Sequence, residues 1–86
     1  MHTVELLEQA CRVAKKLGYQ IRQEYLDGSD GGACEFGGKK WIFIDLALNA
    51  TEQLDQVTQA IRNDPKLGQI QPPETLKMYL EFPKAA

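Results

Sequence analysis

The stretch that decides the fold is Ala33-Cys34-Glu35-Phe36-Gly37-Gly38-Lys39-Lys40-Trp41-Ile42-Phe43-Ile44-Asp45, near the middle of a chain of 86 residues. Its paired glycines fit a two-residue turn of the primed type, which needs positive φ at both positions. The segments on either side are rich in aromatic and β-branched residues, so the stretch predicts a β-hairpin.

The two faces of the predicted hairpin follow from the period of two residues in a strand. One face carries Cys34, Phe36, Trp41, Phe43 and Asp45, and the other carries Ala33, Glu35, Lys40, Ile42, Ile44 and Leu46. Both faces bear large apolar side chains. We therefore expect one face to be covered by the chain's own helices and the other by a terminal segment or a second chain.

Before the hairpin, the pattern predicts a helix and then a strand. From Val4 to Leu17 the apolar residues recur every three or four positions, with Thr3 as the expected N-cap and Gly18 just past the end. From Tyr19 to Tyr25 the period becomes two, which predicts a strand with one buried face. Asp27 to Gly32 has little to bury and is expected to be a connecting loop.

After the hairpin, the pattern predicts two more helices. Asn49 and Glu52 have the spacing of a capping box, and Asn63-Asp64-Pro65 ends the helix that they begin. A short third helix is expected to start at Pro72-Pro73 and to stop at Pro83. The expected buried stripe of the second helix is Leu54, Val57, Thr58 and Ile61.

These elements predict an α+β fold in the order α-β-β-β-α-α. We expect a three-stranded antiparallel sheet, with the two main helices on the face of Ile42 and Ile44 and the short C-terminal helix completing the core. Residues 1–86 are expected to form a single compact domain, because a chain this short hides too little surface for a second core.

Charge and apolar runs exclude several classes of partner. The net charge is −2, and the adjacent basic pairs are Lys15-Lys16 and Lys39-Lys40, so no nucleic acid is expected as a partner. Binding of nucleic acid through Lys39 and Lys40 beside Trp41 is kept as a third alternative. No apolar run reaches the roughly 18 residues of a membrane span, and Met1 to Glu5 does not read as a signal peptide. A cytoplasmic protein without a membrane partner is expected.

The sequence offers few residues for chemistry. Cys11 and Cys34 are expected to be free thiols, and His2 is the single histidine, so neither a metal site nor a cofactor is predicted. Cys34 is the candidate reactive thiol, beside a glycine-rich loop. No histidine, lysine pair or helix N-terminus is evident to stabilise its thiolate, so a structural role is favoured.

Two other polar features favour a structural interpretation. The loop from Asp27 to Gly32 lacks the ligand spacing of an EF-hand and leads into a strand rather than into the helix of a phosphate loop. Asp45 is expected to lie on the opposite face from Glu35, which argues against a catalytic carboxylate pair, and Asp45 is predicted to cap a turn. An enzyme is therefore not favoured.

The aromatic residues Phe36, Trp41 and Phe43 leave two interpretations open. They form ordinary core under the C-terminal helix, with Tyr79 and Phe82 as partners, or they form an exposed binding face. The favoured function is a small non-catalytic interaction domain that uses these three residues, with a protein partner or with a second copy through the aromatic face or an edge strand. The alternative is a thiol-based enzyme or redox sensor that uses Cys34.

The segment from Gly31-Gly32-Ala33-Cys34 through Trp41-Ile42-Phe43-Ile44-Asp45 resembles a small bacterial group of uncharacterised α+β proteins with a Gly-Gly-x-Cys strand. From about Tyr19 to Arg62, the chain is also similar to the strand-then-helix part of ImmA/IrrE-type zinc peptidases. Those enzymes carry His-Glu-x-x-His on the helix after the last strand. The matching helix here, residues 52–62, has no histidine, so the resemblance implies neither metal ligands nor a catalytic residue.

Overall fold

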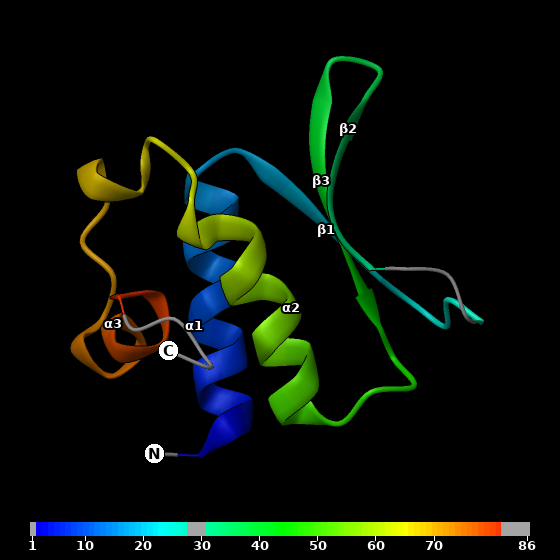
Figure 1. The fold of residues 1–86 in the computed structure, drawn as a ribbon, viewed down its shortest axis with the longest axis horizontal. Coiled ribbons are helices and arrows are strands. Elements are labelled where there is room, and N and C mark those ends of the chain that lie inside the picture. Colours follow the sequence, from blue (N-terminus) through cyan, green and yellow to red (C-terminus); the bar gives the residue numbers. More distant parts are fainter. Residues whose placement is uncertain (1, 28–30, 82–86) are drawn as a thin grey trace.

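The computed structural model describes residues 2–27 and 31–81 of the chain (Figure 1). Its elements are α1 (Thr3–Lys16), β1 (Tyr19–Glu24), β2 (Gly32–Phe36), β3 (Lys39–Asp45), α2 (Ala50–Arg62), the 3-10 turn η1 (Leu67–Gln69) and α3 (Glu74–Glu81). The predicted α+β class, with three strands and three α-helices, is confirmed. The sheet forms one layer, α1 and α2 form the next, and α3 lies beyond them.

The predicted antiparallel sheet is wrong in one strand. The strand order is β1-β3-β2, with β2 antiparallel to the central β3 and β1 parallel to it. Tyr19 lies opposite Lys40 and Glu24 lies opposite Asp45. The strand with apolar residues on both faces takes the centre, where the side chains on each face lie between those of two neighbouring strands. The more polar β1 takes an edge, and Tyr25, which the pattern placed in this strand, lies past its end and is exposed.

The predicted hairpin is confirmed in its turn and in the assignment of its residues to two faces. Gly37 and Gly38 have φ values of 61° and 75°, as a primed turn requires. Phe36 pairs with Lys39 across the turn, so the predicted assignment of residues to the two faces holds along β2 and β3.

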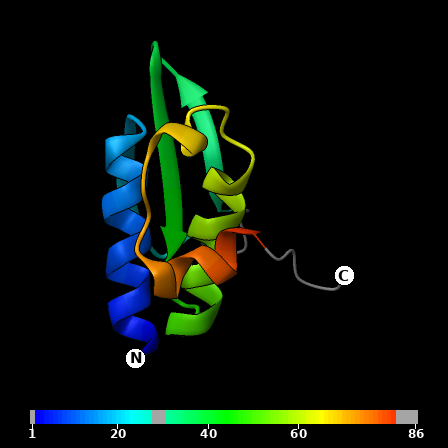
Figure 2. The ribbon, with the colours of Figure 1, turned by 90° about the vertical axis from the view of Figure 1, so that its left-hand side faces the viewer.

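The core lies between the sheet and the two main helices. Ile42 and Ile44 are fully buried against the apolar stripes of α1 and α2, which cover the predicted face. The short helix α3 lies on the far side of α1 and α2 from the sheet and adds Leu76 and Leu80 to the core (Figure 2). The predicted stripe of α2 is buried in full: Leu54, Val57, Thr58 and Ile61.

The helix ends follow the local sequence, with one correction. The predicted capping box is present, since the Glu52 amide donates to Asn49 Oδ1 over 2.8 Å and the Asn49 amide donates to Glu52 Oε1 over 3.1 Å. Gly18 follows α1 with a φ of 98°. Thr3 is not the N-cap: the helix begins one position earlier than predicted, with His2 at the cap and no side-chain cap bond.

Candidate functional site

Three aromatic rings gather on the sheet face away from the helices. The ring centroids of Phe36 and Trp41 are 5.6 Å apart, and those of Trp41 and Phe43 are 6.1 Å apart. The third pair, Phe36 and Phe43, is 6.5 Å apart, and the three interplanar angles lie between 7° and 17°. We call this group the aromatic face. The prediction that these three residues share a face is confirmed, because the period of two in a strand determines which side chains lie on the same face.

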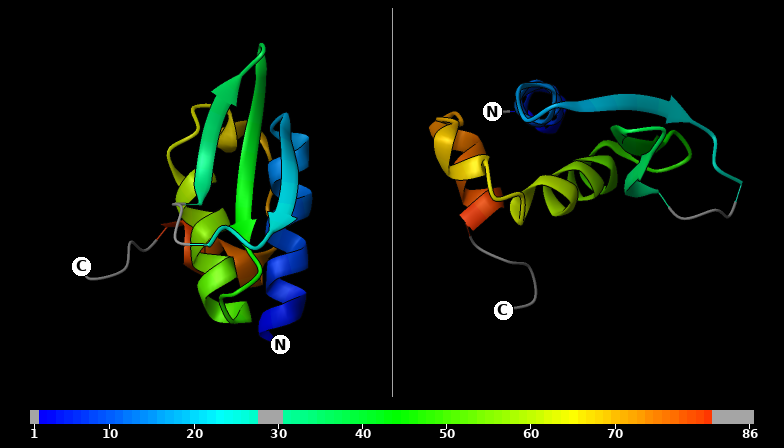
Figure 3. Two further views of the ribbon diagram at one scale, coloured as in Figure 1. Left: turned by 90° about the vertical axis from the view of Figure 1, so that its right-hand side faces the viewer. Right: turned by 90° about the horizontal axis from the view of Figure 1, so that it is seen from above.

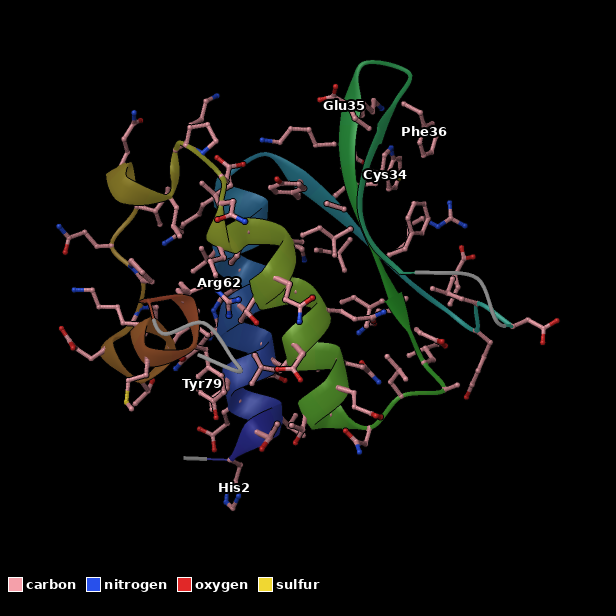
Figure 4. All side chains as sticks on the ribbon, in the orientation of Figure 1. His2, Cys34, Glu35, Phe36, Arg62 and Tyr79 are labelled. Carbon is pink, nitrogen blue, oxygen red and sulfur yellow. The ribbon has the colours of Figure 1, made fainter. Side chains whose placement is uncertain are left out.

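None of the described helices covers the aromatic face. Phe36 is 56% exposed and points away from the helices (Figure 4), while Trp41 and Phe43 are partly buried. The interpretation of these rings as core beneath the C-terminal helix is wrong, because α3 lies on the far side of α1 and α2 from the sheet (Figure 2). Tyr79 lies on that distant helix, where its carbonyl accepts from Arg62 Nη2. Phe82, the other expected partner, lies outside the described residues.

A polar rim borders the aromatic face on the side of β1. The register places Gln20 beside Trp41, Arg22 beside Phe43, and Glu24 on the same face. Arg22 and Glu24 form an ion pair with each other. An aromatic centre with a mixed polar rim is the usual composition of a protein recognition surface.

The indole N–H of Trp41 has no hydrogen-bond partner among the described residues. The Nε1 atom is buried. A buried donor that stays unpaired costs about 1–3 kcal/mol. Because this atom is enclosed by the chain's own residues, an acceptor from a partner reaches it only if the indole or its neighbours move.

Cys34 lies on the same face, directly across from Trp41 in the register, and is exposed. No hydrogen bond joins its sulfur to another described group. Cys11, on α1, is only partly exposed, and burial is the main cause that raises the pKa of its thiol. The two thiols therefore differ mainly in access.

We expect Cys34 to react with a thiol reagent before Cys11 does, because its sulfur is open to solvent and the Cys11 thiolate is disfavoured by burial. The measurement is the two-phase time course of Ellman's reagent at neutral pH. Cys34→Ser should remove the fast phase, and Cys11→Ser should keep it. A fast phase that survives Cys34→Ser would contradict this order.

A second polar cluster lies on the helix side, where β1, β3 and the end of α2 meet. Lys40 Nζ is 3.1 Å from Asp64 Oδ2 and also donates to the Leu17 carbonyl. The Tyr19 hydroxyl donates to Asp64 Oδ2 over 3.1 Å, and Lys40 Nζ lies 4.4 Å from the centroid of the Tyr19 ring. The backbone N–H of Lys66 is the largest cause that lowers the pKa of Asp64, with Lys40 and Tyr19 adding to it. We call Tyr19, Lys40 and Asp64, which are partly buried, the ion cluster.

The ion cluster was not predicted from the sequence, and one of its members, Lys40, was assigned a different role. Lys40 was paired with Lys39 as a cationic alternative, but the register places these lysines on opposite faces of β3. The Lys40 ammonium is held by Asp64, so the nucleic-acid alternative loses one of its two cations. The groups of the cluster bond to one another and to the Leu17 carbonyl. They thereby connect the ends of both main helices to the sheet.

The remaining acids act in turns and surface pairs. Asp45 Oδ1 accepts from the Ala47 N–H over 2.9 Å, which is the predicted turn cap. Glu24 is the register partner of Asp45 but bonds to Arg22 instead. Within residues 2–27 and 31–81, no group of three or more His, Cys, Asp or Glu side chains is placed to hold a metal. No helix in that part of the chain has the length and apolar character to span a bilayer.

No protein-family model, curated protein or solved structure matches the chain. The arrangement of its own residues is therefore the basis for a functional proposal.

Proposed function

We propose that the chain is a small non-catalytic binding domain that receives a protein partner on the aromatic face. One observation carries the proposal: Phe36, Trp41 and Phe43 gather on a sheet face that none of the described helices covers. A chain of this size keeps few large aromatic side chains, and three of them on an uncovered surface mark a recognition site.

The surroundings of the face favour binding over catalysis. Arg22 and Glu24 neutralise each other, and Asp45 is used by backbone N–H groups. General acid–base work needs titratable groups that converge on one position, and these groups do not.

The second candidate function is a thiol sensor that uses Cys34. The observation in its favour is the exposure of this thiol beside Trp41. Oxidation there would add a polar or bulky group to the binding face, so the two candidates share one surface.

The binding proposal is tested with anilinonaphthalene sulfonate, a dye that binds exposed apolar surface. We expect the dye to bind the aromatic face and to quench the emission of Trp41, the single tryptophan, by energy transfer. Phe36→Ser should weaken dye binding roughly tenfold, because it removes one large apolar contact from the site.

The matched control is Met78→Ser, which removes a side chain that is 65% exposed on α3, away from the sheet. This variant should bind the dye as the wild type does. Equal binding by Phe36→Ser and the wild type, or dye binding without quenching of Trp41, would contradict the proposal.

A further inference from the structure

The outer edge of β2 is open to a further strand. β2 ends the strand order β1-β3-β2, and no described segment lies along its outer side (Figure 3). The residues from Ala33 to Phe36 are all exposed. An open strand edge of this kind is a template for pairing with another strand.

The hairpin turn determines which backbone groups of β2 point outward. In a two-residue hairpin, the residues that flank the turn, Phe36 and Lys39, bond to each other through both backbone groups. The alternation along the strand then directs the N–H and C=O of Cys34 toward β3, and those of Ala33 and Glu35 toward the open edge. Among the residues that the structure describes, no backbone bond outside the sheet uses these outward groups.

We propose that two copies of this chain pair through β2, antiparallel and about a two-fold axis that passes beside Cys34. This proposal rests on the binding role proposed above and names a second copy as the partner at the edge of the aromatic face. β2 has five residues, with Cys34 at its centre. Ala33 then lies opposite Glu35 of the second copy, with four backbone hydrogen bonds, and the sheet grows from three strands to six.

The pairing joins the two aromatic faces. Phe36 falls opposite Gly32 of the second copy, which has no side chain to block it. In each chain Gly32 is the register partner of Phe43. The exposed ring of Phe36 is therefore directed across a glycine toward Phe43 of the second copy, an arrangement that stabilises strand glycines. The result is one continuous band that contains both aromatic clusters.

The helix side of the edge also fits the second copy. A groove of about 580 Å³ runs between the start of β2 and α2 and is lined by Gly31, Gly32, Ala33, Gln56, Gln59, Ala60 and Asn63. Ala33 lines this groove, so Glu35 of the second copy, which pairs with Ala33, faces the amides of Gln59 and Asn63. Side-chain amides are donors for a carboxylate.

The other edge of the sheet is less suited to this pairing. β1 carries Arg22 and Glu24 within its six residues, and charged side chains discourage strand addition. β2 carries one charge, Glu35, and the two-fold axis sets it against Ala33 rather than against its own copy. A joint built on one short strand is small, so we expect the weak, reversible association of interfaces below about 1,200 Å².

Sedimentation of the full chain at rising concentration, under reducing conditions, tests the proposal. We expect a dimer in equilibrium with monomer. Glu35→Pro should weaken the dimer tenfold or more, because proline removes the outward N–H of each copy and leaves the bonds to β3 intact. The matched control, Glu35→Gln, keeps that N–H and should still dimerise. Circular dichroism and Trp41 emission check that both variants fold.

A chemical readout locates the axis. The two-fold axis makes Cys34 and Cys34 of the second copy a pair that shares no backbone hydrogen bond. In such an antiparallel pair the Cα atoms lie about 4.5 Å apart, which is within the range of a disulfide. Added oxidised glutathione takes two electrons from two Cys34 thiols, which lose two protons, and yields two reduced glutathione molecules and the cross-linked dimer. Cys11→Ser should cross-link as the wild type does, and Cys34→Ser should not.

Three outcomes would overturn the proposal: a monomer at every concentration, a dimer that Glu35→Pro leaves unchanged, or cross-linking no faster in the wild type than in Glu35→Pro. Dye binding separates this proposal from the binding role. A monomer whose Trp41 is still quenched by the dye loses the dimer alone, whereas loss of dye binding removes the proposed function itself.

Discussion

Replacing Lys40 by methionine is expected to destabilise the protein by about 2 kcal/mol, the usual value of a hydrogen bond to a charged group, because Asp64 keeps its bonds from Tyr19 and Lys66. The side chain of Asp64 is only 4% exposed, and Lys40 supplies its positive partner. Methionine keeps most of the aliphatic length of lysine, so the change removes the ammonium and little packing. Urea unfolding followed by Trp41 fluorescence measures the loss.

Lys39→Met is the matched control, since Lys39 is exposed and lies on the other face of the same strand. A surface change of this kind should alter the free energy of unfolding by no more than about 0.5 kcal/mol. Equal losses in the two variants would contradict the role assigned to the ion cluster.

The pH dependence checks the same prediction independently. The pKa of Asp64 is lower in the folded chain than its ordinary value, chiefly because the Lys66 N–H donates to the carboxylate. Its stabilising effect is therefore present above the unfolded value of about 3.9 and is lost as the pH falls through the folded value. The difference between the wild type and Lys40→Met should be largest near neutral pH and should shrink below pH 4.

Gly31→Ala is expected to cost about 2 kcal/mol through overpacking between β2 and α2. A Cβ at this position would lie 2.8 Å from the carbonyl oxygen of Phe43 and closer still to the side-chain amide of Gln56. Gln56 cannot move away freely, because its Oε1 accepts from the Asp45 N–H over 3.0 Å. Thermal or urea unfolding measures the effect.

Gly68→Ala is the control for this change. Gly68 has nothing within 4 Å of an added Cβ, so alanine should leave stability unchanged or raise it slightly. A Gly31→Ala variant as stable as Gly68→Ala would show that the contact between β2 and α2 is looser than the distances imply.

The features that the sequence predicted are those set by neighbouring residues. Gly37-Gly38 specifies its own turn, and the Asn49 and Glu52 side chains meet within a single helical turn. The position of β1 was wrong because strand pairing is decided at a distance: Tyr19 and Lys40, for example, are joined only through the finished sheet. The polar side chains of β1 indicate an edge strand. The predicted antiparallel sheet did not take this into account.

In the candidate site, too, the sequence predicted the local features and not the long-range ones. Period two placed Phe36, Trp41 and Phe43 on one face, but whether a helix covers that face depends on where α3 packs, and no local pattern encodes that choice. The ion cluster joins residues that are 24 and 45 positions apart in the sequence. Such contacts leave no spacing signal in a single sequence.

The parallel pairing of β1 with β3 has a consequence for the order in which the chain assembles. The hairpin of β2 and β3 closes through a two-residue turn and needs only local contacts, which form in microseconds. β1 is made earlier on the ribosome, yet it has no partner until β3 exists, because its register links Tyr19 to Lys40 and Glu24 to Asp45. We therefore expect the first strand to be synthesised to be the last to join the sheet.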